Sequence, residues 1–249
     1  MKIIKYKKEK NNQYIVILEN NIKIKLYEEV IIKYKLLIQK EIHELDEILR
    51  ENKIYECYYS AIRFLNIKKR SKNEIKLKLQ SLGFEKDEIE KTIIKIIKQN
   101  YINDRDYAIS FVKEKILLTI HGPNRIKNDL RKKGIEEDII NMAMEQYDLN
   151  IQNEKINKLI NKIIKMNQNK GTIYLKRKIY NNLEYQGFNK ENIDEIIKTK
   201  TFTENKNAKE KEEERLRKKY INKYNGIKLE YKIKAELKRK GLLFKDEEI

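Results

Sequence analysis

After about residue 44 the hydrophobic residues recur at helical spacing, and one apolar pattern returns four times. A glycine ends each copy, and successive glycines are 51, 53 and 54 residues apart: Gly83, Gly134, Gly187 and Gly241. A leucine stands four residues before each glycine and an isoleucine stands eight before it, so both lie on one helical face. The pattern predicts a helix that a left-handed glycine terminates, with an apolar residue directly after it.

Each copy has room for three helices, which we expect at residues 53–67, 71–82 and 86–99 in the first repeat. The predicted repeats cover residues 51–103, 104–149, 150–203 and 204–249, and the last is partial because only a stub follows Gly241. Such tandem repeats predict an all-α fold, stacked in an extended curved array. The other glycines, Gly122, Gly171 and Gly226, should mark the ends of the preceding helices, and Pro123 should open a new helix.

The first fifty residues follow a different pattern, in which Ile22, Ile24 and Leu26 alternate with lysines. We expect strands at residues 2–6, 13–18 and 21–26 in a small antiparallel sheet, followed by a short helix from about Tyr27. Because so small a sheet is unstable alone, a helix should cover one of its faces. Residues 1–50 are therefore predicted to form a separate N-terminal part.

Charge adds a functional expectation, since 57 Lys and Arg oppose 39 Asp and Glu and give a formal net charge of +18. A surface this positive favours an anionic partner. Lys, Ile, Asn and Tyr are abundant together, however, so a merely solvated lysine-rich surface is the alternative. No apolar run reaches the roughly 20 residues that span a bilayer, and the single cysteine, Cys57, indicates a reducing compartment. We expect a cytoplasmic monomer that uses no membrane.

The placement of the charges favours a functional surface, because basic residues gather on the second helix of each repeat and on the segment before it. Acidic residues instead open the third helix, as at Glu85, Asp87 and Glu88, where they complement the positive helix end. Lysine and arginine side chains gathered on one helix of each repeat would neutralise the phosphates of a nucleic acid without recognising a particular base sequence. The candidate residues for binding DNA or a DNA-bound filament are Lys68, Lys69, Arg70, Lys72, Arg125, Lys127, Arg131, Lys132, Lys133, Lys176, Arg177, Lys178, Lys238, Arg239 and Lys240.

Other chemistry finds little support in the sequence. A helix-turn-helix repressor is disfavoured because the third helix begins with carboxylates, which the phosphates lining a groove would repel. The tyrosines near the cations are candidates for stacking on unpaired bases, although their spacing suits a core equally: Tyr58, Tyr59, Tyr180, Tyr185 and Tyr231. Asp104 and Asp106 are expected to cap a helix, and His43 and His121 have no metal-ligand spacing. We therefore expect no catalysis, no metal and no cofactor.

Two segments resemble a known family, the RecX regulators of recombination. The first contains residues 61–65, the Arg70 to Ile75 run and the Gly83-Phe84 pair. The second is closer and contains residues 101–104, Tyr107-Ala108, Gly122-Pro123 and residues 130–135. The resemblance covers residues 55–147 and thins beyond them, while the sheet-forming N-terminus is similar to the longer versions of low-GC Gram-positive bacteria.

The resemblance implies a protein that binds the RecA recombinase in the groove of its filament on single-stranded DNA and restrains its ATPase and strand exchange. It also implies binding to DNA itself, single-stranded and possibly double-stranded, and no catalytic residues. Arg70, Lys72, Arg125 and the 131–133 run match the basic motif of the family. The chain departs from it at Tyr180, where the other repeats carry lysine, and in its fourth repeat. A general nucleic-acid-binding scaffold without a recombinase partner is the alternative function.

Overall fold

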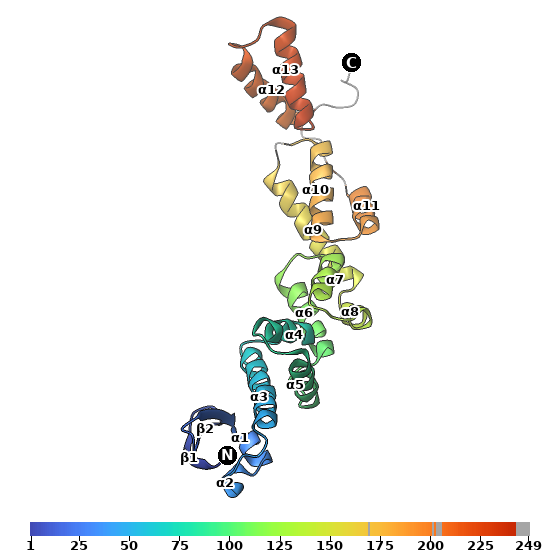
Figure 1. Ribbon diagram of the computed structural model, residues 1–249. Coiled ribbons are helices and arrows are strands. Elements are labelled where there is room, and N and C mark those ends of the chain that lie inside the picture. Colours follow the sequence, from blue (N-terminus) through green and yellow to red (C-terminus); the bar gives the residue numbers. More distant parts are fainter. Residues whose placement is uncertain (169, 201, 203–205, 243–249) are drawn as a thin grey trace. The chain divides into compact units, whose positions relative to one another are not determined.

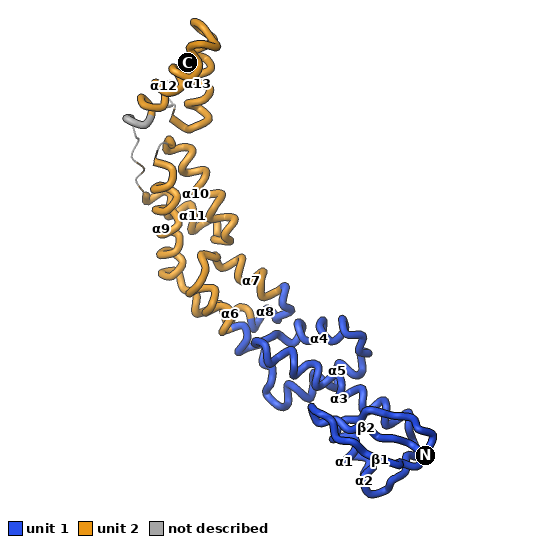
Figure 2. Tube along the Cα trace, turned by 90° about the vertical axis from the view of Figure 1, so that its left-hand side faces the viewer, with its two compact units in different colours: residues 1–108, 132–139 blue, residues 109–131, 140–249 orange. Residues whose placement is uncertain are grey.

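The protein forms thirteen helices and one three-stranded sheet in the residues that the structure, a computed structural model, describes (Figure 1). These are residues 1–168, 170–200, 202 and 206–242. Two compact units make up the chain, one of residues 1–108 with 132–139 and one of residues 109–131 with 140–249 (Figure 2). The predicted fold class, helical tandem repeats with a small N-terminal antiparallel sheet, is confirmed.

The N-terminal sheet has the strand order β1 (Ile3–Lys8), β2 (Gln13–Leu18) and β3 (Lys23–Tyr27), all antiparallel. Asparagines at positive φ, a region that this residue type tolerates, make the two turns: Asn11, Asn12 and Asn21. Two short helices follow, α1 (Glu28–Lys33) and α2 (Leu36–Gln39). Buried residues from the strands, these helices and the start of α3 share one core, which gives the sheet its covered face.

Eleven helices follow the N-terminal part and build the repeats. The first repeat contains α3 (Leu45–Leu65), α4 (Lys72–Ser81) and α5 (Lys86–Lys98), so its first helix begins earlier than expected. The second contains α6 (Asp104–Leu118), α7 (Pro123–Lys132) and α8 (Glu137–Met144). The third contains α9 (Leu149–Met166), α10 (Thr172–Gln186) and α11 (Lys190–Thr199). The fourth contains α12 (Lys206–Tyr220) and α13 (Gly226–Arg239), and the predicted stub after them lies outside the described residues.

The middle helix of each repeat ends as the glycine pattern predicts. Gly83, Gly134, Gly187 and Gly241 all have φ between +65° and +89°, where a side chain would be strained. The leucines and isoleucines at four and eight residues before them are all buried, with at most 2% of their surface exposed. After α4, for example, the Phe84 N–H donates to the Leu79 carbonyl across the glycine, as in a Schellman cap.

The middle helices of the third and fourth repeats are about one turn longer than those of the first two. They have 15 and 14 residues in α10 and α13 against 10 in both α4 and α7. The added turn contributes one more buried leucine to each repeat, Leu175 and Leu229. At the same distance from the repeat glycine, the shorter helices have Ser71 and Gly122, which already lie at the helix start.

Contrary to the expectation from the sequence, Gly122, Gly171 and Gly226 do not mark the ends of the preceding helices. Those helices end at Leu118, Met166 and Tyr220, and the three glycines stand at the start of the next helix. Gly122 and Gly171 each lie against the repeat glycine of the following repeat. The Gly122 N–H donates to the Gln186 carbonyl at 2.7 Å, and the Gly171 N–H donates to the Lys240 carbonyl at 3.0 Å. A Cβ on either glycine would lie within 2.5 Å of that backbone, so close approach explains them.

A serine takes the corresponding place in the first repeat. The Ser71 hydroxyl accepts from the Glu74 N–H as the N-cap of α4 and donates to the Lys133 carbonyl at 2.7 Å. Beside it, the Lys133 ammonium lies 2.8 Å from the Glu74 carboxylate. Burial acts to raise the pKa of Glu74, but the hydrogen bonds from Lys133 and the Ser71 N–H outweigh it and hold that pKa below its ordinary value. The end of one middle helix thus meets the start of another at three places.

Candidate nucleic-acid interface

The candidate cations of the first repeat lie around the start of α4. Lys68 and Lys69 stand in the exposed segment after α3, and Lys72 is exposed at the first position of α4. Arg70 is different, because its side chain is only 15% exposed and its guanidinium lies 4.1 Å from the centre of the Phe64 ring. It also lies 3.8 Å from the Glu74 carboxylate. Arg70 is therefore part of the internal packing of this repeat.

In the second repeat, α7 and Lys133 directly after it provide five candidates with two kinds of surroundings. Arg131 and Lys132 are exposed at its end, and Arg131 donates to Asn128 at 2.8 Å. The other three are partly buried, and their side chains interact with residues of the same chain. Lys127 donates to Asn141 at 3.1 Å, and Lys133 is held by Glu74. The remaining one, Arg125, lies against the third repeat.

Arg125 links the start of α7 to the end of α10. Its guanidinium lies 5.3 Å from the centre of the Tyr185 ring and donates to the Gln186 side chain at 3.4 Å. Its backbone N lies 2.5 Å from where a Cβ on Gly187 would stand. This arginine therefore stabilises the contact between consecutive repeats, and replacing it would disturb packing as well as charge.

The third and fourth repeats show the same division. Lys178 donates to Asn167 at 2.8 Å, and Lys240 lies 2.5 Å from Glu212 with only 16% of its side chain exposed. Lys176 and Arg177 are exposed on α10, and the Lys176 ammonium lies 5.4 Å from the centre of the Phe202 ring. Lys238 and Arg239 are exposed at the end of α13, where Arg239 pairs with Glu236.

The structure thus separates the fifteen sequence candidates into two sets. Six are partly buried and make contacts within a repeat or, for Arg125 and Lys133, between two repeats: Arg70, Arg125, Lys127, Lys133, Lys178 and Lys240. Nine present their cationic groups on the surface, and we call them the exposed cations: Lys68, Lys69, Lys72, Arg131, Lys132, Lys176, Arg177, Lys238 and Arg239. Charge counting along the sequence cannot make this distinction, because it depends on which carboxylates and carbonyls the fold brings near.

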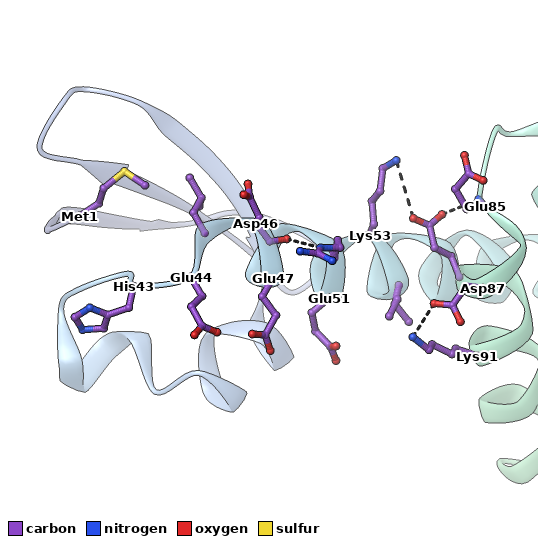
Figure 3. A pocket seen from close by; sticks show the side chains of 14 residues that line it. Met1, His43, Glu44, Asp46, Glu47, Glu51, Lys53, Glu85, Asp87 and Lys91 are labelled. Atoms are coloured by element: carbon purple, nitrogen blue, oxygen red, sulfur yellow. Dashed lines mark hydrogen bonds and ion pairs between the residues drawn. The ribbon is translucent and has the colours of Figure 1, made fainter.

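Carboxylates gather in a different place, a cleft of about 1130 Å³ between the starts of α3 and α5 (Figure 3). The acidic start of the third helix, predicted from the sequence, supplies Glu85, Asp87 and Glu88. The long helix α3 and its N-cap residue add four more that the sequence did not connect with them: Glu44, Asp46, Glu47 and Glu51. Among the described residues, two of these carboxylates pair with lysines that line the cleft. Asp87 lies 2.7 Å from the Lys91 ammonium, and Glu88 lies 4.0 Å from that of Lys53. The cleft is a negative region that would repel phosphates.

Asp104 does cap a helix, but not its own. Its carboxylate accepts from the Lys72 N–H at 2.8 Å, which is the first N–H of α4. Asn103 caps α6 instead by accepting from the N–H groups of Arg105 and Asp106. Burial raises the pKa of Asp104, and the bond from Lys72 only partly offsets this. The fold uses this carboxylate to connect α6 to the start of α4.

The remaining reactive groups are structural. Cys57 is fully buried in α3, and burial raises the pKa of its thiol to about 11, so it stays protonated. No three His, Cys, Asp or Glu side chains come together as a metal site in the residues described. Within the same residues, no helix has the length and apolar character needed to cross a bilayer.

The five tyrosines considered for base stacking also fall into two groups, three at least half-buried and two exposed. Tyr58 is only 9% exposed in the core of the first repeat, and Tyr59 and Tyr180 are half-buried against cores. Tyr185 and Tyr231 are 73% and 75% exposed. Tyr185 shares a hollow of α10 with Asn181 and Asn182, which charge patterning did not single out.

Comparison with known proteins connects this architecture to one family. Two segments match family models described as the first and second three-helix domains of RecX, at residues 57–95 and 103–144. The regulatory protein RecX of Oceanobacillus iheyensis is 30% identical over 225 residues, which cover 87% of this chain and 82% of that protein. The regulatory protein RecX of Listeria innocua is 30% identical over 76% of this chain and 71% of its own length.

Solved structures agree with these matches. A crystal structure of regulatory protein RecX superposes with a TM-score of 0.69 at 25% identity, covering 80% of this chain and 99% of that one. RecX from Lactobacillus salivarius gives a TM-score of 0.57 at 32% identity, covering 59% of this chain and 96% of that one. With its tandem three-helix domains and relatives along most of its length, this chain belongs to the RecX family of regulatory proteins.

Proposed function

We propose that this protein regulates the RecA recombinase by binding the RecA filament on single-stranded DNA and restraining its activity. Membership of a regulatory family carries this proposal, since the kinship extends over most of the chain. The protein would act as a monomer in the cytoplasm, where RecA and the chromosome are found. It performs no catalysis in this role.

The exposed cations support a direct contact with DNA. Several stand at or near an end of a middle helix, where α4 begins and where α7 and α13 end: Lys72, Arg131, Lys132, Lys238 and Arg239. Lysines and arginines there replace the counterions of a phosphate backbone, which gives salt-dependent affinity without sequence preference. The six partly buried cations contribute by stabilising contacts within the repeats and, for Arg125 and Lys133, between them.

The acidic cleft supports a second, different kind of contact. Phosphates would avoid its seven carboxylates, so DNA is expected on other faces of this unit. A basic surface of a protein partner suits such a cleft. We therefore assign the cleft to the RecA side of the complex and the exposed cations to the DNA side.

Co-sedimentation with RecA filaments tests this proposal. Filaments assembled on single-stranded DNA with a non-hydrolysable nucleotide should carry the protein into the pellet, and DNA-free RecA should carry less. A double variant of the cleft, Glu47→Lys with Asp87→Lys, should reduce pelleting with filaments and leave binding to naked DNA intact. Binding to naked DNA without any recruitment to filaments would contradict the proposal and favour a general nucleic-acid-binding scaffold.

A further inference from the structure

We propose that the exposed face of α10 is a binding site for one nucleotide of a single-stranded nucleic acid. The base would stack on Tyr185 and the phosphate would lie at Arg177. This inference rests on the proposed DNA contact and specifies which strand form and which residues it involves. Six residues spaced along one face of α10 line a hollow of about 420 Å³: Tyr174, Arg177, Lys178, Asn181, Asn182 and Tyr185.

The aromatic end of this hollow is Tyr185. Its side chain is 73% exposed, while the buried face of α10 is made by Leu175, Ile179 and Leu183, so the ring is not a core residue. The guanidinium of Arg125 lies 5.3 Å from its centre and is held by Gln186. A ring fixed in this way and open to solvent offers a stacking surface for a planar base at small entropic cost.

The polar lining complements the other parts of a nucleotide. Arg177 is exposed and has no hydrogen-bond or ion-pair partner among the residues described. The same holds for the side-chain amides of Asn181 and Asn182, each of which offers a donor and an acceptor to a base edge. Lys178 is anchored by Asn167 and Tyr174 and adds a fixed positive charge. None of the described residues that line the hollow is a carboxylate, so its lining does not repel a phosphate.

The other middle helices lack this combination. At the distance of Tyr185 from the repeat glycine, they carry Ser81, Lys132 and Arg239. At the distance of Asn182 they carry Lys78, Asp129 and Glu236, of which two are acidic. Only α10 therefore joins an exposed aromatic ring, two free amides and an unpaired arginine on one helix face within the described repeats.

Single-stranded nucleic acid is the ligand that uses all of these groups together. In a duplex the base faces are stacked on one another and the pairing edges are occupied, so neither the ring nor the amides would be engaged. An acidic peptide would use Arg177 and Lys178 but leave Tyr185 and the amides without a role. The hollow thus selects unpaired bases, which is the form of DNA inside a recombinase filament before pairing.

A tryptophan reporter tests the site directly, because the chain contains no tryptophan. In the full chain, Tyr185→Trp places a single indole in the hollow. Oligothymidylate should quench its fluorescence strongly, whereas a duplex or an abasic oligomer of equal length should not, since stacking requires accessible bases. The matched control is Tyr231→Trp on α13. This position is equally exposed but has no counterpart of the two asparagine amides of α10, so its fluorescence should change little.

Affinity measurements by anisotropy complete the test. Tyr185→Leu should weaken oligothymidylate binding roughly 5- to 150-fold, while Tyr185→Phe keeps the ring and should bind as wild type does. Arg177→Ala should flatten the dependence of log affinity on log salt by about 0.7. Equal quenching of both reporters, quenching by the abasic oligomer or by polyglutamate, or full affinity in Tyr185→Leu would overturn the site. If wild type binds DNA and Tyr185→Leu binds equally well, the α10 site alone fails; if wild type binds no DNA, the proposed DNA contact fails with it.

Discussion

Gly122 and Gly171 serve a purpose that their own backbone conformation does not reveal. Gly171 has φ −74° and ψ 163°, which any residue adopts, yet a Cβ there would lie 1.4 Å from the Gly241 carbonyl oxygen. By contrast, nothing among the described residues lies within 4 Å of a Cβ on Gly83 or Gly226. The glycines at which a Cβ would clash are the ones that contact another repeat.

Replacing Gly171 isolates this close approach. We expect Gly171→Ala to destabilise the packing of the fourth repeat by about 1–3 kcal/mol, the range for overpacked sites. Hydrogen exchange of the α13 amides should accelerate, while the amides of α4 keep their protection. Thr172→Ala at the next position is the control and should leave α13 unchanged. Wild-type exchange rates in Gly171→Ala would contradict the role we assign to this glycine.

Ser71 allows a second test at the first repeat. Ser71→Ala removes both the N-cap of α4 and the bond to the Lys133 carbonyl, so the free energy of unfolding should fall by roughly 1–2 kcal/mol. Ser81→Ala is a matched control because its exposed hydroxyl only donates to the Lys78 carbonyl. Chemical denaturation of both variants measures the difference. Equal stability of the two would show that the Ser71 contacts do not hold this junction.

Single residues also limit what the sequence can predict about the site. The basic candidates follow from the sequence because they recur at the same helix in four repeats. Their division does not, since Lys132 and Lys133 are neighbours of the same charge, and only the fold places Glu74 beside Lys133. Of the acidic cleft, only the carboxylates at the start of α5 were predicted. Those of α3 lie some forty residues earlier in the sequence, and only the fold brings the two groups together.

The connection between α6 and α7 contains a half-buried histidine, His121, in a positively charged setting. His121 Nδ1 is buried and has no hydrogen-bond partner among the described atoms. Burial lowers the pKa of His121, and the nearby Arg125, Lys115 and Lys155 lower it further against the opposing effect of Asp129. The Tyr147 hydroxyl fixes the same residue by donating to its carbonyl at 2.8 Å. These surroundings favour the neutral form of the His121 imidazole.

Acidification should therefore destabilise this part of the protein. A histidine whose folded pKa lies below its unfolded value of about 6.5 leaves stability intact above that pH. As the pH falls below it, the unfolded chain binds the proton first and unfolding becomes easier. Thermal unfolding between pH 7.5 and roughly 5.5 should show this loss in wild type and in the exposed control His43→Gln. His121→Gln should show less of it, and an unchanged pH dependence in that variant would contradict the assignment.

Elements were largely predictable because their signals are local. Alternating hydrophobics predicted the three strands to within two residues, and repeat glycines predicted the ends of four middle helices. The start of α3 was missed because five of residues 45–52 are charged or polar, although Leu45, Ile48 and Leu49 already have helical spacing. Gly122 and Gly171 were misassigned because the backbone that leaves no room for a Cβ there belongs to another repeat, far away in the sequence.

At the scale of the whole molecule, a net charge of +18 coexists with a seven-carboxylate cleft. Separated charges of this kind suit a protein that contacts a polyanion with some surfaces and a protein with another. The net charge alone is a poor guide to the binding surface, because six of the candidate cations are partly buried. Reversing the charge of Arg125 or Lys133 would break contacts between repeats, so a loss of binding in such a variant could not be assigned to a lost DNA contact. A test of the binding surface must change only exposed cations.

The rate of ATP hydrolysis by the cognate RecA on single-stranded DNA, with substoichiometric amounts of this protein, tests the central claim most directly. Wild type should inhibit, and Arg131→Glu with Lys132→Glu should inhibit far less because the reversed charges repel phosphates. The control Lys162→Glu with Lys165→Glu makes the same charge change at exposed positions of α9 and should inhibit as wild type does. No effect of wild type on RecA despite measurable DNA binding, or equal inhibition by the α7 variant, would contradict the account.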